Sequence, residues 1–515
     1  MRILRAAAVA IAAFAFSHAS AADLRIGLAA TPTSMDPQFY VVGPNSAMAR
    51  NIFDGLVNQD ERQQLKPALA TAWTLIDDTT WEFKLRRGVV FHDGSPLTSA
   101  DIVASIARVP LASRNSPSSF MPYVEEIAKV EPIDDLTVRI RTKAPAPLLL
   151  NNLSRIAILP AAMLERPTAD LNSGKGVVGT GPLKFVSWTP DNQIVLARND
   201  KYWGPKAAWD KVTFRVIADS GARVAALKAG DVDMIEGVPT SDIKNIESDS
   251  KLKIVTVASN RVMYLHMDQS RDISPFAAGD DGKNPLLKPE VRHAISLSIN
   301  RQAIVDRIMD GQGESAGQLV PKGYFGWSPA IGVDGYDPNK AKELLAAGGY
   351  PNGFKLTFHA SNDRYPNDSK VAQAIGQMLN RIGVKASIDV MPGSVYFSRA
   401  SKLEFSFIMG GAAVETGEAA SVLGPLLATY SPTTGQGNRG RYSNPAFDKA
   451  LSGALSTIDE AAREKLLQSA MEIGMKDHGV IPLFFLGASW AMRSGLSYGG
   501  RTDGYTLAAD VRNAQ

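Results

Sequence analysis

The segment FHDGSPLTSADIVASI, from Phe91 to Ile106, follows an alternation of apolar and polar side chains at residues 81–85 that predicts a β-strand. A tight turn is expected at Asp93-Gly94, because glycine adopts the backbone angles that such a reversal requires. Thr98 precedes Asp101 by three residues, which is the spacing of a helix capping box. Apolar residues then mark one face of a helix, at Ile102, Val103 and Ile106. The segment therefore predicts a strand, a turn and a capped helix in immediate succession.

A second pattern, in the other half of the chain, is that of a βαβ unit. Residues 355–359 and 384–390 alternate as strands and flank an amphipathic helix predicted over residues 369–382. Residues 405–409 fit a further strand, and residues 288–309 form one long helical pattern. Because a βαβ connection joins parallel strands, this half should hold a parallel sheet covered by helices, as in an α/β fold.

Length and composition narrow the class of protein. A chain of 515 residues is too long for one hydrophobic core, so two or three domains are expected. The chain has no cysteine, which excludes disulfides, thiolate metal sites, a cysteine nucleophile and a lipidated cysteine anchor. Its net charge is only +3, so composition gives no support for nucleic acid or an anionic membrane as a partner.

The first residues have the pattern of a secretory signal peptide. Arg2 and Arg5 precede an apolar run at residues 6–16, and Ala19-Ser20-Ala21 is a small-residue cleavage site. We expect residues 1–21 to be removed, which takes away two basic and no acidic residues and lowers the net charge to +1. The mature chain should diffuse freely in the periplasm, with no lipid anchor.

Beyond these local patterns, a series of motifs resembles the solute-binding proteins of family 5, the extracytoplasmic receptors of peptide, opine and nickel importers of the ATP-binding cassette (ABC) type. Besides the segment 91–106, the motifs stand in the family's order: Ser34-Met35-Asp36-Pro37, Pro67-Ala68-Leu69-Ala70, Gly179-Thr180-Gly181-Pro182, Asn199-Asp200-Lys201-Tyr202-Trp203, Val291-Arg292-His293-Ala294, Tyr336-Asp337-Pro338 and Ile481-Pro482-Leu483. The resemblance covers nearly the whole mature chain. It implies a two-lobed periplasmic-binding-protein fold of type II, cluster C, with an extra subdomain in the first lobe.

The same resemblance implies how the chain is divided. Residues 22–267 and 482–515 would form the first lobe, with an inserted subdomain at about residues 58–178, and residues 268–481 would form the second lobe. Two crossings near Met267 and Ile481 would act as the hinge on which the lobes close over a ligand.

No catalytic motif is present. The sequence lacks a G-x-S-x-G elbow, an H-E-x-x-H pair and a phosphate-binding G-x-x-x-x-G-K-[ST] loop. Five histidines remain after cleavage, and no two of them share a helix face at ligand spacing. We therefore expect a binding protein rather than an enzyme, with no metal site and no cofactor.

The loop after the strand at residues 355–359 is the first candidate for ligand contact. In an open α/β sheet the crevice lies at the carboxyl ends of the strands, which is where this loop begins. Arg364 can hold a ligand carboxylate with two parallel hydrogen bonds, and Tyr365 can pack beside it. The position is similar to that of a carboxylate-binding arginine in dipeptide-binding relatives. A solvated surface arginine is the alternative.

The second candidate is the loop after residues 405–409. Peptide-binding relatives often have Gly-Trp followed by aspartates here, one of which receives the ligand's α-ammonium group. This chain has Gly411 in place of the tryptophan, and its available carboxylates are Glu415 and Glu418. The departure indicates a ligand shaped differently from a standard dipeptide. A solvent-facing carboxylate is the alternative.

Four further side chains are weaker candidates for lining the cleft. Gln38 and Tyr40 follow the Asp-Pro turn, where family members often contact ligand, and Tyr264 and Tyr396 are aromatic candidates. Aromatic side chains at such positions also occur as ordinary core residues.

The predicted function is that of a periplasmic receptor that encloses a small peptide or an amino-acid conjugate, such as an opine, and delivers it to an inner-membrane ABC permease. We expect a monomer. A nickel- or haem-binding receptor of the same fold would require histidines clustered around the cleft. A peptide-binding chaperone would bind peptides weakly and unselectively. A secreted hydrolase would require a serine with a base in reach, near Glu415 or His359.

Overall fold

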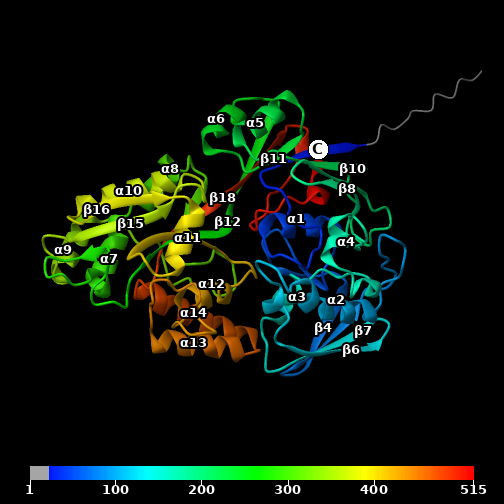
Figure 1. Ribbon diagram of the computed structural model, residues 1–515, viewed down its shortest axis with the longest axis horizontal. Helices are drawn as coiled ribbons and strands as arrows, with labels where there is room; N and C mark the ends of the chain where they lie inside the picture. Colours follow the sequence, from blue (N-terminus) through cyan, green and yellow to red (C-terminus); the bar gives the residue numbers. More distant parts are fainter. Residues whose placement is uncertain (1–21, 515) are drawn as a thin grey trace, which may run out of the picture.

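The computed structural model describes residues 22–514, so the predicted signal peptide lies outside the described residues. The chain forms two lobes on either side of a gap (Figure 1), with one long mixed sheet running through both. Its order is β13-β15-β17-β12-β18-β11-β1-β10-β9-β8, and β14 (Gly313–Ser315) and β16 (Lys385–Met391) pair with β18 and β15. No helix in residues 22–514 is long and apolar enough to cross a membrane.

The first lobe is built on five strands of this sheet: β1 (Asp23–Leu28), β8 (Leu183–Thr189), β9 (Gln193–Arg198), β10 (Lys211–Val216) and β11 (Met234–Glu236). Its helices are α1 (Gly43–Ile52), α4 (Thr168–Asn172), α5 (Ser220–Ala229) and α6 (Ile243–Glu247). Two short antiparallel pairs complete it, β2 (Val57–Gln59) with β3 (Leu65–Pro67), and β19 (Leu496–Ser497) with β20 (Arg512–Asn513). The strands are covered by a buried apolar cluster that includes Ile26, Leu196 and Phe214.

A separate four-stranded antiparallel sheet forms the inserted subdomain. Its order is β4 (Ala70–Asp77), β5 (Thr80–Leu85), β7 (Thr137–Thr142) and β6 (Ile127–Asp134), and α2 (Ser99–Ala112) and α3 (Leu149–Leu153) pack with it. The predicted strand and capped helix are β5 and α2. The capping box is present, because the Asp101 carboxylate accepts a hydrogen bond from the Thr98 backbone N–H at 2.7 Å.

The second lobe contains the predicted βαβ unit. β15 (Lys355–Ser361) is parallel to β16, the connecting helix is α10 (Asp368–Arg381), and β17 (Phe407–Ala413) is parallel to the other edge of β15. The predicted long helix over residues 288–309 is instead two helices, α7 (Pro289–Ser298) and α8 (Arg301–Arg307), because Asn300 begins a new helix by accepting a hydrogen bond from the Ala303 N–H. The other elements are β13 (Ala277–Ala278), α9 (Pro338–Ala347), α11 (Gly393–Ser401), α12 (Ala420–Leu427), α13 (Pro445–Ser456) and α14 (Glu460–Lys476).

Two long antiparallel strands connect the lobes: β12 (Leu252–Met267) and β18 (Ile481–Arg493). Val255 and Val257 pack with the first-lobe core, whereas Met263 and Leu265 belong to the second-lobe core. The register of the pair shifts between Ala258 and Val262. The change of lobe therefore lies inside β12, several residues before the predicted crossing near Met267, because one continuous strand serves both cores.

Candidate ligand-binding cleft

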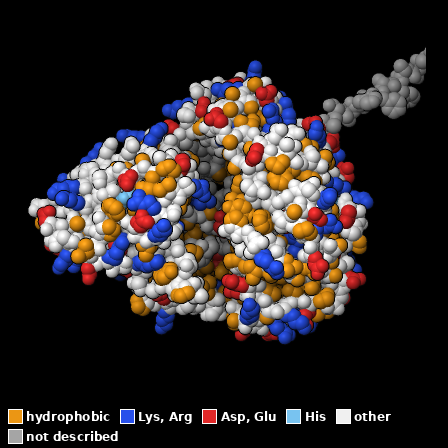
Figure 2. Space-filling view, viewed as in Figure 1, with side chains coloured by type: hydrophobic (Ala, Val, Ile, Leu, Met, Phe, Trp, Pro, Cys, Tyr) orange, Lys and Arg blue, Asp and Glu red, His pale blue; other side chains and the backbone are white. Residues whose placement is uncertain are grey.

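A cavity of about 570 Å³ lies between the lobes, and Figure 2 shows the hollow between the two bodies. Glu236, Thr240 and Trp490 line it from the first lobe, and Met309 and Asn367 line it from the second. The walls touch where the Asn367 amide donates a hydrogen bond to Thr240 Oγ1 at 3.1 Å. Its size is that of a site for a small organic molecule or a short peptide.

The two predicted ligand loops leave the same edge of the second-lobe sheet. β15 and β17 are parallel, with Phe358 beside Phe407, so their carboxyl ends point the same way. Residues 362–367 follow β15 and residues 414–419 follow β17. The Tyr365 hydroxyl donates a hydrogen bond to the Gly411 carbonyl at 3.3 Å, which ties the first loop to the end of β17.

Arg364 is the cationic side chain of the first loop. It is exposed, and in residues 22–514 its guanidinium forms no hydrogen bond or ion pair with another residue. The guanidinium carbon lies 5.1 Å from the centre of the Tyr365 ring, and Tyr365 itself is buried. The guanidinium is free to meet an anionic group, but Pro366 and Asn367 of this loop line the cavity and Arg364 does not, so its contact with a ligand stays a prediction.

Gly411 occupies the place where peptide-binding relatives often have tryptophan, and its surroundings explain the departure. A Cβ atom at this position would lie 2.9 Å from the Tyr365 ring and 2.9 Å from the Met263 sulfur. The Tyr365 ring thus fills the space that a side chain at position 411 would need.

Glu415 faces the first lobe. Its Oε2 lies 3.1 Å from Nη2 of Arg155, and 43% of its side chain is exposed, whereas 3% of the Arg155 side chain is exposed. Arg155 also donates to the Tyr505 hydroxyl at 3.3 Å. The carboxylate of Glu415 is therefore accessible, but an arginine of the opposite lobe already balances its charge.

Glu418 was predicted beside Glu415 as a ligand carboxylate, and the structure corrects this. Only 2% of its side chain is exposed, and both of its oxygens accept hydrogen bonds from Arg463, at 2.8 and 2.9 Å. Burial raises the pKa of Glu418, against the opposing effect of Arg463. The pair lies at the boundary between the lobes, where it lines a pocket together with Gln63 and Trp81 of the first lobe, and its charges already satisfy each other.

Three other predicted ligand residues are also core residues. The Gln38 side chain is buried, donates to the carbonyls of Ser105 and Ala157, and accepts from Arg108. Tyr396 is 1% exposed and donates to the Met409 carbonyl at 2.6 Å. Tyr264 is 3% exposed, and burial raises its pKa to about 12. The side-chain amide of Gln38 and the hydroxyl of Tyr396 point into the lobes, where they donate to backbone carbonyls.

Tyr40 differs from these three. It is half-buried, and its hydroxyl forms no hydrogen bond with another residue of the described chain. It stands just before α1 and does not line the cavity between the lobes, so its contact with a ligand stays a prediction.

Sequence reasoning missed two charged residues near the gap. Arg155 follows the apolar run at residues 148–153, and a lone arginine in such a run was a usable signal. Glu236 ends β11 at the cavity wall, where it accepts hydrogen bonds from the Ala29 N–H at 3.0 Å and from Thr506 Oγ1 at 2.5 Å. Burial raises the pKa of Glu236. Nothing in its local sequence distinguishes it from a surface glutamate.

The hydrolase alternative required a serine with a base near Glu415 or His359. Among the described residues, no serine hydrogen-bonds to either side chain. The His359 ring is buried against Phe405, and burial lowers its pKa to about 4. The structure brings no activated nucleophile to these positions.

The chain is similar to known proteins along most of its length. The family model described as "Bacterial extracellular solute-binding proteins, family 5 Middle" matches residues 64–433. The glutathione-binding protein GsiB of Pectobacterium atrosepticum is 31% identical over 495 residues, which cover 92% of this chain and 90% of the relative. GsiB of Escherichia coli K12 is 29% identical and covers 93% and 92%.

Solved structures agree with this assignment. The periplasmic binding protein DppA from Helicobacter pylori, in complex with the peptide STSA, is 28% identical, with a TM-score of 0.74 over 96% of this chain and 98% of that one. CtaP from Listeria monocytogenes, at 22% identity, shares the fold with a TM-score of 0.83 over 96% and 100%. The predicted two-lobed α/β fold of type II periplasmic binding proteins is confirmed. The chain belongs to family 5 of the bacterial extracellular solute-binding proteins.

Proposed function

We propose that this protein is the periplasmic receptor of an ABC importer for a short peptide or an amino-acid conjugate such as glutathione. It captures the solute between its lobes and delivers it, chemically unchanged, to an inner-membrane permease. The names of the relatives support this ligand class, because GsiB proteins are glutathione-binding and the Helicobacter protein holds a peptide. The leader pattern at residues 1–21 supports a periplasmic location.

The observation that carries the proposal is the unpaired guanidinium of Arg364 at the carboxyl edge of the second-lobe sheet. A cation without a partner among the described residues is suited to a ligand carboxylate, and the ring of Tyr365 lies beside it, 5.1 Å from the guanidinium carbon. Glu415, on the loop beside it, offers a carboxylate for an ammonium group. Opposite charges on adjacent loops match a zwitterion such as glutathione.

Closure of the lobes strengthens these contacts. In the open cleft, water screens the charges, and removal of that water raises the energy of each charged contact. β12 and β18 are the only connections at the centre of the described sheet, and the register shift between Ala258 and Val262 gives the hinge a local irregularity at which to bend. Tyr40 completes the proposed ligand set from the first lobe.

The proposal is tested by a thermal-shift screen of the mature chain, residues 22–515, against glutathione, dipeptides, tripeptides, agropinic acid, nickel and haem. A ligand at one hundred times its dissociation constant adds about 2.7 kcal/mol of stability, which raises the melting temperature measurably. We expect glutathione or a short peptide to give the shift. A shift with nickel or haem alone would contradict the ligand class, and weak shifts with all peptides alike would favour a chaperone.

The second step of the test is Arg364→Ala. Loss of a charge-assisted hydrogen bond costs about 1.5–3 kcal/mol, so the affinity for the ligand found in the screen should fall about 10- to 100-fold in calorimetric titration. The matched control is Arg381→Ala, which removes an exposed and unpaired arginine from the other end of α10. Equal affinities of the two variants would exclude Arg364 as the carboxylate anchor.

A further inference from the structure

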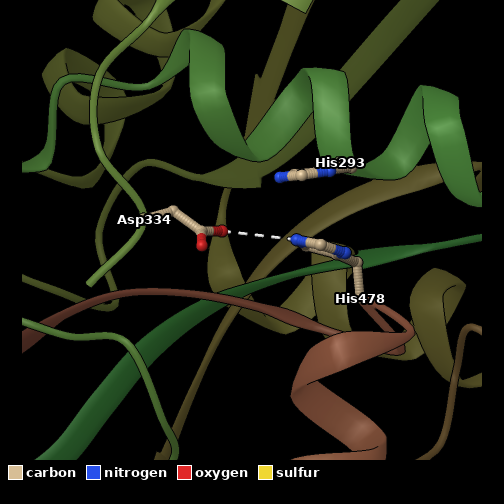
Figure 3. A group of neighbouring side chains, drawn as sticks. All are labelled: His293, Asp334 and His478. Atoms are coloured by element: carbon tan, nitrogen blue, oxygen red, sulfur yellow. Dashed lines mark hydrogen bonds and ion pairs between the residues drawn. The ribbon is translucent and has the colours of Figure 1, made fainter. Parts of the chain in front are cut away.

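Three side chains that are distant in sequence meet on the second lobe (Figure 3): His293, Asp334 and His478. His293 comes from α7, Asp334 from the segment before α9, and His478 from the turn between α14 and β18. One ligand atom from each residue lies within 4.8 Å of the others. None of the three lines the cavity between the lobes.

The backbone and the neighbouring side chains hold this cluster in place. His478 has a left-handed backbone conformation, with φ of 49°, which is uncommon for a residue other than glycine. Its Nε2 lies 3.3 Å from Oδ2 of Asp334, and its ring stacks on that of His293 with 4.7 Å between the centres. Ser296 donates a hydrogen bond to the same carboxylate at 2.5 Å and orients it.

Several atoms of the cluster that could bind a metal ion have no hydrogen-bond partner among the described residues. Neither ring nitrogen of His293 forms a hydrogen bond with another residue of the described chain, and Oδ1 of Asp334 accepts none there. His478 is 12% exposed and Asp334 is 36% exposed by side chain, so an ion can enter from solvent and keep water in a remaining position. Two imidazole nitrogens and a carboxylate oxygen suit divalent zinc, nickel, copper and iron.

We propose that His293, His478 and Asp334 bind one divalent transition-metal ion, with zinc as the probe. Metal–nitrogen bonds of about 2.0–2.1 Å place neighbouring ligand atoms about 3.3 Å apart, the separation that His478 and Asp334 already have. Rotation of the half-buried His293 ring would bring its nitrogen to the same distance from the ligand atoms of His478 and Asp334. The Ser296 hydroxyl is the outer partner that keeps the carboxylate in position.

The surrounding charge limits the strength of this site. Arg301 and Lys340 lie close enough to act on the charges of Asp334 and His293, and both repel a cation. We therefore expect micromolar affinity for zinc rather than the tighter binding of a buried structural site. The bound ion would link α7 to the turn that precedes β18, the strand that continues into the first lobe. It would therefore stabilise the second lobe independently of the transported solute.

The test is titration of metal-stripped mature protein with zinc, followed by calorimetry and thermal shift. We expect one equivalent of zinc to raise the melting temperature. His293→Gln and His478→Asn should each weaken binding at least tenfold, and asparagine tolerates the left-handed backbone at position 478. The matched control is Asp389→Asn, which alters a histidine–carboxylate contact of 3.6 Å with His359 and should leave zinc binding unchanged.

Copper as a second probe gives a spectroscopic check. Electron paramagnetic resonance should show two nitrogen ligands in the wild-type protein and one in His293→Gln. Zinc binding that is equal in all variants, or absent at millimolar zinc, would overturn the proposal. Displacement of zinc by saturating S-methylglutathione, which lacks the zinc-binding thiol, would also overturn it, because the metal would then lie in the cleft. Arg364→Ala should leave zinc binding intact, so this test and that of the transport function fail separately.

Discussion

The loop that follows β17 has two sides, and each holds a carboxylate in a different way. On the side that faces the first lobe, Glu415 is 43% exposed and is paired with Arg155 of the opposite lobe. On the other side, Glu418 is 2% exposed and is paired with the likewise buried Arg463 of its own lobe. Two carboxylates only three positions apart therefore differ in access: a ligand can reach Glu415, whereas Glu418 is buried in its ion pair.

The role of a charged side chain thus depends on how deeply it is buried and on which residue pairs with it. Its residue type and its position in a motif do not decide that role. A buried ion pair is costly to break, because the remaining charge is left without water or a partner. A pair with one exposed member is easier to break, because water replaces the lost contact of the exposed group. The buried side of the loop should therefore govern stability, and the exposed side should govern binding.

The largest expected effect comes from breaking the buried side. Glu418→Gln leaves Arg463 buried without its counter-charge and should lower the free energy of unfolding by about 3–5 kcal/mol. Glu415→Gln should cost less, about 1–3 kcal/mol, because the buried Arg155 loses its counter-charge but keeps the Tyr505 hydroxyl as a partner. Urea unfolding of the mature protein, followed by circular dichroism, measures both. Equal losses in the two variants would remove the distinction between the two sides.

A double variant controls for the loss of packing. Glu418→Leu together with Arg463→Met replaces both charges with apolar groups of similar size, which is often neutral for a buried pair. It should recover most of the stability that Glu418→Gln loses. If it is as unstable as the single variant, shape rather than charge is what Glu418 supplies.

A smaller effect is expected from Gly411→Ala, at the point where the loop meets its neighbour. The added Cβ would stand 2.9 Å from the Tyr365 ring, so the ring must move and lose its hydrogen bond to the Gly411 carbonyl. Overpacking of this kind costs about 1–3 kcal/mol. Glutathione affinity should fall as well, because Arg364 stands next to the displaced Tyr365.

Thermal shift and calorimetry of Gly411→Ala are compared with those of Gly424→Ala on α12, where an added Cβ meets nothing within 4 Å. The helical control should be neutral or slightly stabilising. Lower stability with unchanged affinity in Gly411→Ala would show that the two loops act independently.

The sequence could predict the position of both loops but not the role of each side chain in them. Parallel strand order follows from the βαβ pattern, and it places residues 362–367 and 414–419 at one edge. The partner of Glu415 could not be predicted, since Arg155 is 260 residues away in sequence. Tyr396 and Gln38 lie in suitable segments, yet their side chains turn inward and donate to backbone carbonyls, whereas Tyr264 packs in an apolar core.

The histidines show the same limit. His293 and His478 are 185 residues apart and share no helix, so their spacing predicted no metal site. Only the packing of α7 against the end of α14 brings their rings to 4.7 Å. The helical pattern at residues 288–309 was readable, but its interruption at Asn300 depends on one side-chain hydrogen bond.

The smallest effects should come from the exposed side of the loop, and they separate two roles for the pair between Arg155 and Glu415. If Glu415 receives a ligand ammonium group, Arg155 competes with that group for the carboxylate. Arg155→Met removes the competitor and should tighten glutathione binding severalfold, whereas Glu415→Gln should weaken it by about tenfold, or 1.4 kcal/mol. Methionine keeps the apolar packing of the buried arginine stem.

N-acetylated glutathione, which has no ammonium group, is the control ligand. The affinity of the protein for this control ligand should not change in Glu415→Gln. The comparison is made by calorimetric titration of both ligands into the wild-type protein, Arg155→Met and Glu415→Gln. Opposite changes in the two variants, confined to the ligand that carries an ammonium group, would assign Glu415 to ligand recognition. If both variants instead lose affinity equally for both ligands, the ion pair stabilises the closed arrangement of the lobes. Loss of a contact needed for closure lowers the affinity for every ligand by the same factor.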